Sequence, residues 1–75
     1  MQNITKKLFK KIFGNTIKIN MNSNINNIRM WDSLNHIRLI SGIEKIITKK
    51  LSINQVIRLT SVKKIDSLLK KNEKK

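Results

Sequence analysis

The chain has 75 residues and a formal net charge of +13, and it contains no cysteine. A chain of this length forms one small domain with a single core, which excludes a deep enzyme pocket supported by several layers of residues. The lack of cysteine excludes disulfides and thiolate zinc sites, and four acids with one histidine are too few for the usual metal sites. We therefore expect no metal-binding residues.

The high positive charge has two competing explanations. Charge of this size suggests a nucleic-acid or anionic-membrane ligand. However, the sequence contains 14 lysines, 14 isoleucines and 10 asparagines, which are residues favoured by codons rich in adenine and thymine. No apolar run approaches the roughly 18 residues that a membrane-spanning helix needs. We expect a soluble cytoplasmic protein without a membrane span, and both explanations of the charge stay open.

The first predicted helix spans residues 4–13. Its lysines fall on one face, and apolar residues at helical spacing fall on the other. These apolar residues are Ile4, Leu8, Phe9, Ile12 and Phe13. Gly14 and Asn15 are typical of a helix end. The sequence thus predicts an amphipathic helix with a basic outer face.

Residues 16–30 are rich in asparagine and show no sustained helical period. Asparagine side chains compete for backbone hydrogen bonds and favour turns. We therefore expect a long ordered loop, pinned to the core by the isoleucines in it. Those isoleucines are Ile17, Ile19, Ile25 and Ile28.

A second helix is predicted to begin near Asp32 or Ser33 and to end near 48–50. Asp32 is the expected N-cap, because its carboxylate can accept backbone N–H bonds at the positive end of the helix. Ser33 then becomes the first residue inside the helix, and its hydroxyl points outward. The apolar stripe of this helix contains Leu34, Ile37, Ile40, Ile43 and Ile47.

The sequence SINQ at 52–55 has the form of a capping box, so a short helix that carries Val56, Ile57 and Leu59 is expected after it. A last helix follows TSV at 60–62, and residues 71–75 form an expected frayed basic tail. The prediction is an all-α fold in one domain, residues 1–75. It is a small four-helix bundle of three main helices and one short helix, with a long loop after the first.

Asp32, Ser33 and His36 contain the residue types of a hydrolytic triad, but their order argues against one. The acid adjoins the serine instead of orienting the histidine. No glycine-rich turn offers oxyanion donors. We therefore expect no catalytic residues, a half-exposed His36, and a Trp31 side chain that packs over the helix start.

Asp32-Ser33-Leu34 stands in a wider pattern. It is followed by LISGIEKI at 39–46 and by LSINQVIRLTSVKKIDSLL at 51–69. From residue 28 to residue 70 the chain resembles the acyl (or peptidyl) carrier proteins, which bind phosphopantetheine. The first helix resembles them only in its pattern.

This resemblance implies a 4′-phosphopantetheine arm on Ser33, taken from coenzyme A by a separate phosphopantetheinyl transferase. The arm would hold acyl or aminoacyl groups as thioesters and present them to loading and transfer enzymes, as in fatty acid or polyketide biosynthesis. The protein itself would be a monomeric carrier and not an enzyme, since the chemistry belongs to the prosthetic group and the partners.

Carriers of this family are usually acidic, whereas the second helix here carries Asn35, His36, Arg38 and Lys45 with Glu44 as its acid. Partner recognition is therefore expected to depend on four residues or on an acidic partner surface. The four are Asp32, Leu34, Ile37 and Val56.

Two other functions stay open at this point. The first is a basic helical nucleic-acid-binding protein, although no aromatic stacking platform is evident and we expect no nucleic acid. The second is a peptide that lies on a membrane surface through its first helix.

Overall fold

The computed structural model describes residues 1–15 and 17–72. They form four helices, α1 (Asn3–Phe13), α2 (Ser33–Ile47), α3 (Ile53–Arg58) and α4 (Val62–Lys71), and no strand within those ranges. The prediction of an all-α fold with three main helices and one short one is confirmed. Of the predicted tail, Lys71 still belongs to α4, and residues 73–75 lie outside the described residues.

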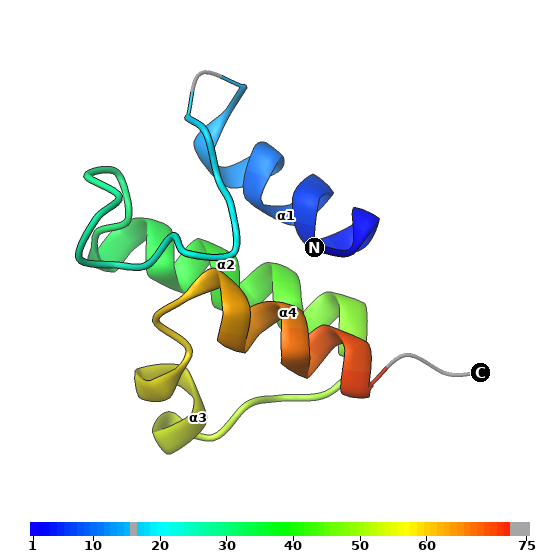
Figure 1. Cartoon of the computed structure of the whole chain (residues 1–75). Coiled ribbons are helices and arrows are strands. Elements are labelled where there is room, and N and C mark those ends of the chain that lie inside the picture. Colours follow the sequence, from blue (N-terminus) through cyan, green and yellow to red (C-terminus); the bar gives the residue numbers. More distant parts are fainter. Residues whose placement is uncertain (16, 73–75) are drawn as a thin grey trace.

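The three longer helices surround one core. α1 packs against α2 and α4, and α2 packs against α4 (Figure 1). α3 contributes no buried residue and lies at the margin of the bundle. The core consists of Leu8, Phe9, Phe13, Trp31, Leu39, Ile40, Ile43, Leu59, Val62, Ile65 and Leu69. Because α3 adds so little to this core, its position depends on polar contacts.

Aromatic side chains fill one end of the core. The ring centroids of Phe9 and Phe13 lie 5.9 Å apart, and Trp31 meets Phe9 edge-on at 5.4 Å. These distances are in the favourable range for aromatic pairs. Trp31 is only 2% exposed and stands just before α2. The predicted packing of Trp31 over the helix start is confirmed.

The long loop between α1 and α2 is held against the segment that precedes α4. The N–H of Ile25 donates to the carbonyl of Thr60 at 2.9 Å, and the N–H of Val62 donates to the carbonyl of Ser23 at 3.0 Å. All four predicted isoleucines pack against the core. In its described residues the loop is therefore ordered, as the sequence predicted.

The helix ends follow the sequence signals closely. Gly14 ends α1 with a φ of 83°, a conformation that glycine adopts without strain. Ser52 and Gln55 form the predicted capping box of α3. The Ser61 hydroxyl accepts the N–H of Lys64 and caps α4. Local side-chain chemistry thus determines where these helices start and stop.

A polar clasp of Gln2, Thr5 and Asp66 joins α1 to α4, and the sequence did not predict it. Asp66 Oδ1 accepts hydrogen bonds from the Thr5 hydroxyl at 2.6 Å and from the backbone N–H of Gln2 at 3.0 Å. Thr5 is fully buried, whereas Ile4, which was assigned to the apolar face, is 42% exposed. Thr5 precedes Leu8 and Phe9 by three and four residues, so a regular helix turns it toward the interior, whereas Ile4 lies at the exposed edge of the apolar face.

The clasp also changes the acidity of its carboxyl group. Burial raises the pKa of the Asp66 carboxyl, but hydrogen bonds from Thr5 and Gln2 and the nearby N-terminal ammonium lower it more. The net result is a pKa below the ordinary value of an aspartate. The charged form of Asp66 therefore stabilises the fold.

Candidate functional site

The start of α2 has the arrangement that the sequence predicted. The side chain of Asp32 accepts the N–H of Asn35 at 2.9 Å and is the N-cap of α2. Ser33 is the first residue of the helix, and its side chain is exposed. Since Asp32 already satisfies the backbone, the Ser33 hydroxyl is not needed as a cap.

These features make Ser33 suitable for attachment of a phosphate ester. The N-terminus of a helix carries a partial positive charge and N–H groups without partners in the helix, and both favour an anion. An exposed hydroxyl on the first residue places an attached phosphodiester at this end.

His36 is buried, so the expectation of a half-exposed side chain is wrong. The indole N–H of Trp31 donates to His36 Nδ1 at 3.0 Å, and His36 Nε2 lies 2.8 Å from the carbonyl oxygen of Val56. An indole N–H can only donate and a carbonyl can only accept, so His36 is the neutral tautomer with its proton on Nε2. The ring is covered because α3 packs over it.

His36 therefore connects the start of α2 to α3. Trp31 lies two residues before Ser33, and Val56 lies in the middle of α3. Both ring nitrogens of His36 are used, which leaves no free nitrogen to act as a base on Ser33. This geometry agrees with the sequence argument against a hydrolytic triad.

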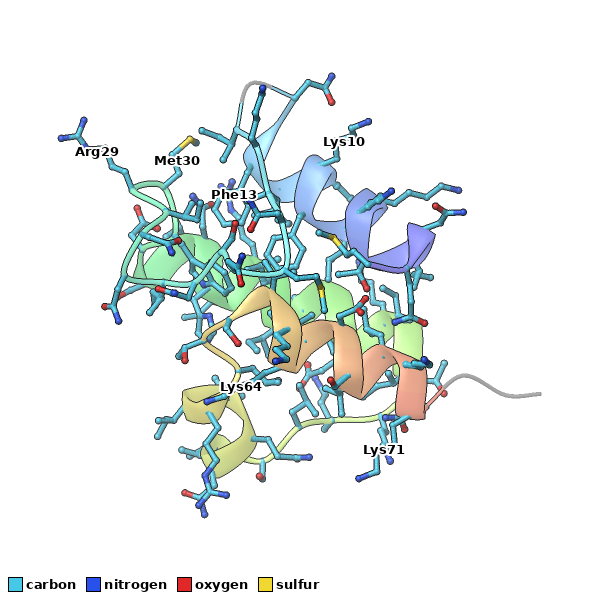
Figure 2. All side chains as sticks on the ribbon, viewed as in Figure 1. Lys10, Phe13, Arg29, Met30, Lys64 and Lys71 are labelled. Atoms are coloured by element: carbon cyan, nitrogen blue, oxygen red, sulfur yellow. The ribbon has the colours of Figure 1, made fainter. Side chains whose placement is uncertain are left out.

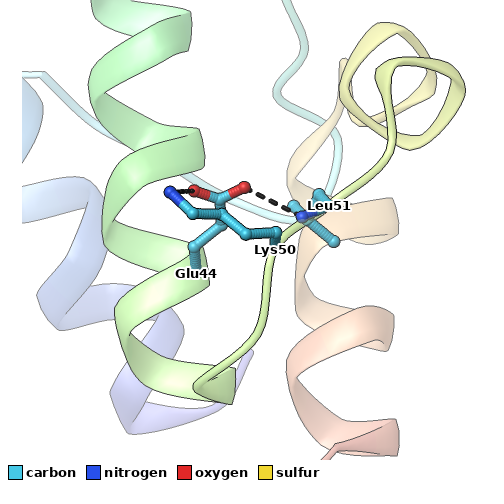
Figure 3. Close-up of polar contacts among 3 residues, drawn as sticks. All are labelled: Glu44, Lys50 and Leu51. Atoms are coloured by element: carbon cyan, nitrogen blue, oxygen red, sulfur yellow. Dashed lines mark hydrogen bonds and ion pairs between the residues drawn. The ribbon is translucent and has the colours of Figure 1, made fainter.

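Glu44 fixes the other side of α3. Its Oε2 accepts the N–H of Leu51 at 2.8 Å, and its Oε1 lies 3.7 Å from the ammonium of Lys50 (Figure 3). The lysine side chain is 92% exposed, so the ion pair contributes little stability. The bond to Leu51 orients the segment that leads into α3.

The apolar stripe predicted for α2 divides between the core and the surface. Ile40 and Ile43 are buried, but Leu34 is 61% exposed and Ile37 is 64% exposed. The reason is that Leu34 and Ile37 lie away from the side of α2 that packs against α1 and α4. Two apolar side chains near Ser33 are therefore open to a partner.

On α3 the most exposed apolar residues are not Val56, which the sequence analysis named for partner recognition. Val56 is partly buried and packs against the core. Ile53 is 77% exposed and Ile57 is 64% exposed. They lie four residues apart, on one face of the helix. This spacing is visible in the sequence, but which face of α3 is exposed depends on how the helix packs.

The tripeptide Asp-Ser-Leu also occurs at 66–68, inside α4. There the aspartate belongs to the polar clasp, and the serine lies in the middle of a helix, away from a free N-terminus. Ser67 is exposed, so exposure alone does not distinguish it from Ser33. What distinguishes Ser33 from Ser67 is its position at the start of a helix that is already capped.

The positive charges are spread over the molecule. Figure 2 shows Lys10 on α1, Arg29 in the loop and Lys64 and Lys71 on α4 extending away from the ribbon. Exposed cations also lie on α2 and α3, at Arg38, Lys45 and Arg58. Within the described residues no cluster of side chains could hold a metal ion, and no helix is long and apolar enough to cross a bilayer.

Comparison of the chain with protein-family models, with curated proteins and with solved structures gives no match.

Proposed function

We propose that this protein is an acyl or aminoacyl carrier that bears 4′-phosphopantetheine on Ser33. The observation that carries the proposal is the exposed Ser33 hydroxyl on the first residue of α2, beside an Asp32 that already caps the helix. The Asp32-Ser33-Leu34 motif and its resemblance to the carrier proteins support the same residue.

The modification needs a separate transferase and coenzyme A. A phosphodiester would form at Ser33 Oγ while the pyrophosphate bond of coenzyme A breaks and adenosine 3′,5′-bisphosphate leaves. The serine proton would pass to a base of the transferase. When bound, the arm supplies a terminal thiol for thioester formation. The chain contributes the hydroxyl, the positive helix end and the surface that a partner contacts.

Docking of the transferase and of later enzymes would use the exposed apolar residues around Ser33. Leu34 and Ile37 lie on α2, and Ile53 and Ile57 lie on α3. The hydrogen bond from His36 to Val56 keeps the two helices together at this place. Apolar side chains in the centre of an interface commonly dominate its binding energy.

The absence of cysteine makes the test direct. The protein is incubated with coenzyme A and a permissive transferase, and its intact mass and thiol content are then measured. We expect one phosphopantetheine adduct and one thiol per chain, since the unmodified chain has none. An unmodified mass, or an adduct that persists in Ser33→Ala, would refute the proposal.

The alternative of nucleic-acid binding has weaker support. Cations lie on every helix instead of on one face, which agrees with a general bias in composition. Binding to nucleic acid through phosphates would weaken steeply as salt is raised. Titration with a labelled oligonucleotide at about 0.15 M salt checks this alternative, and we expect no specific binding.

A further inference from the structure

A groove of about 430 Å³ runs between α1 and α2. Its floor is apolar and includes Leu8 and Ile12 from α1. A second hollow of about 470 Å³ shares Ile4 and Ile46 with it and continues toward the start of α1 and the end of α2. The proposed carrier function does not use this surface.

Gly42 leaves room for the Leu8 side chain at the floor of the groove. A Cβ atom at this position would lie 2.6 Å from Leu8 Cδ1, so only glycine leaves Leu8 undisturbed. Glycine inside a helix costs about 1 kcal/mol relative to alanine. The packing of Leu8 against α2 accounts for a glycine in the middle of a 15-residue helix.

Four exposed cations line the groove. Lys7 and Lys11 come from α1, and Arg38 and Lys45 come from α2. Within residues 1–15 and 17–72 no acidic side chain lines it. Along the helices the first pair is about 6 Å apart and the second pair about 10 Å apart, at 1.5 Å per residue. An apolar floor between two positively charged edges requires an occupant with an apolar face and acids on both flanks.

We propose that this groove binds an acidic amphipathic helix of a partner protein. The 11 residues of α1 span roughly 16 Å, which matches about three turns of a partner helix. Apolar residues at i, i+3, i+4 and i+7 would face the floor, in the manner of other helix-in-groove complexes. Glutamates or aspartates on both flanks would meet the four cations.

Other anionic ligands match the groove less well. A single fatty-acid carboxylate would neutralise only one of four cations. A flat bilayer surface would rest on the edges of a concave groove and leave the apolar floor uncovered. A convex ligand with several acids satisfies both the shape and the charge, and a helix is such a ligand.

The test uses the full chain and a synthetic helical peptide of about 15 residues with leucines on one face and glutamates on both flanks. The peptide carries a fluorophore, and anisotropy gives its affinity at about 0.15 M salt. Chemical-shift changes in ¹⁵N-labelled protein locate the site. A shuffled peptide of the same composition keeps the charge and loses the apolar face.

Two double variants distinguish binding in the groove from general electrostatic attraction to a positively charged protein. Lys7→Glu with Lys45→Glu reverses charge in the groove. Lys63→Glu with Lys64→Glu makes the same change in net charge on exposed residues of α4, outside the groove. We expect the groove variant to bind the peptide at least about tenfold more weakly than the wild-type protein. The affinity of the α4 variant should stay within about twofold of the wild-type value. Lys45→Glu alone serves if the double variant unfolds.

Several results would overturn the proposal. These are an equal loss of affinity in both double variants, equally tight binding of the shuffled peptide, shift changes outside α1 and α2, or no binding of the designed peptide. Groove-dependent binding to phosphatidylglycerol vesicles without peptide binding would also overturn it, in favour of a lipid surface. Ser33→Ala protein should bind the peptide normally, so this result is independent of the modification.

Discussion

Asp-Ser-Leu occurs twice in this chain, at 32–34 and at 66–68, and the two copies have different roles. In the first copy, Asp32 caps α2 and Ser33 is the first residue of the helix. In the second copy, Asp66 is buried in the clasp with Thr5, and Ser67 lies inside α4. The same three residues thus form a candidate attachment site in one place and a structural contact in the other.

The difference shows that the tripeptide alone does not define a site. The first copy follows directly after the long loop, so it stands at the start of α2, where the helix is open to solvent. The second copy follows a start that Ser61 already caps. An aspartate inside a helix has no cap to form, and here it finds buried donors instead.

Removal of each serine should give opposite results in the transferase reaction. Ser33→Ala should abolish the phosphopantetheine adduct, because the acceptor hydroxyl is gone. Ser67→Ala should leave the adduct unchanged, since a serine in the middle of a helix lacks the positive helix end. Intact mass after incubation with coenzyme A measures both. An adduct that depends on Ser67 would reverse the assignment.

The residue four positions after each aspartate also differs. His36→Lys should destabilise the fold by about 3 kcal/mol, because it buries a charge and leaves the Trp31 indole N–H without an acceptor. Lys70→His is the reverse exchange at an exposed position of α4. Its free energy of unfolding should stay within about 0.5 kcal/mol of the wild-type value. Urea denaturation gives both free energies of unfolding. Equal losses would contradict the role of His36.

The two aspartates should contribute unequally to stability. Asp66→Ala removes the acceptor of three hydrogen bonds and should cost about 2–3 kcal/mol. Asp32→Ala removes one exposed helix cap and should cost about 1 kcal/mol. The comparison is made by urea denaturation at neutral pH. A larger loss for Asp32 would mean that the clasp contributes less than its geometry indicates.

Acidification should affect the second copy in particular. The pKa of Asp66 is lower in the folded state than in the unfolded chain. Its stabilising contribution is therefore present above an unfolded pKa of about 3.9 and is lost as pH falls through the folded value. We expect the urea midpoint to fall between about pH 5 and pH 2. In Asp66→Asn the urea midpoint should depend less on pH. An unchanged pH profile in this variant would contradict the role of Asp66.

The two leucines should show the smallest difference in stability. Leu34→Ala should change the free energy of unfolding by less than about 0.5 kcal/mol, since the side chain is mostly exposed. Leu68→Ala, which removes a side chain packed against the core, should cost about 1–2 kcal/mol. In the transferase reaction the order should reverse, with Leu34→Ala slowing modification about fivefold and Leu68→Ala having no effect.

Most of the secondary structure was predictable because its signals are local. The Asp32 cap, the capping box at 52–55 and the glycine after α1 each act within a few residues of the chain. The aromatic and aliphatic spacing of α1 identified Leu8, Phe9 and Phe13 as core residues in the same way. These interactions need no knowledge of the neighbouring helices.

The errors concern residues whose environment comes from another helix. His36 is buried because α3 covers it, and Thr5 is buried because Asp66 approaches it from α4. Neither partner lies within 15 residues in the chain, so the sequence contained no sign of these hydrogen bonds. Val56 differs from Ile53 and Ile57 for the same reason, because only the packing of α3 decides which of its sides faces inward.

The sequence by itself determined that this is a small, basic, all-α chain, where its helices start and stop, and that Ser33 stands first in α2 with a spare hydroxyl. The tertiary structure decided which apolar residues remain outside, that His36 links Trp31 to α3, and that α1 and α2 form a basic groove over Gly42. The physical reason is the distance along the chain over which each kind of interaction acts. Caps and periodicity act between neighbours in the chain, whereas burial and grooves arise from side chains that folding brings together.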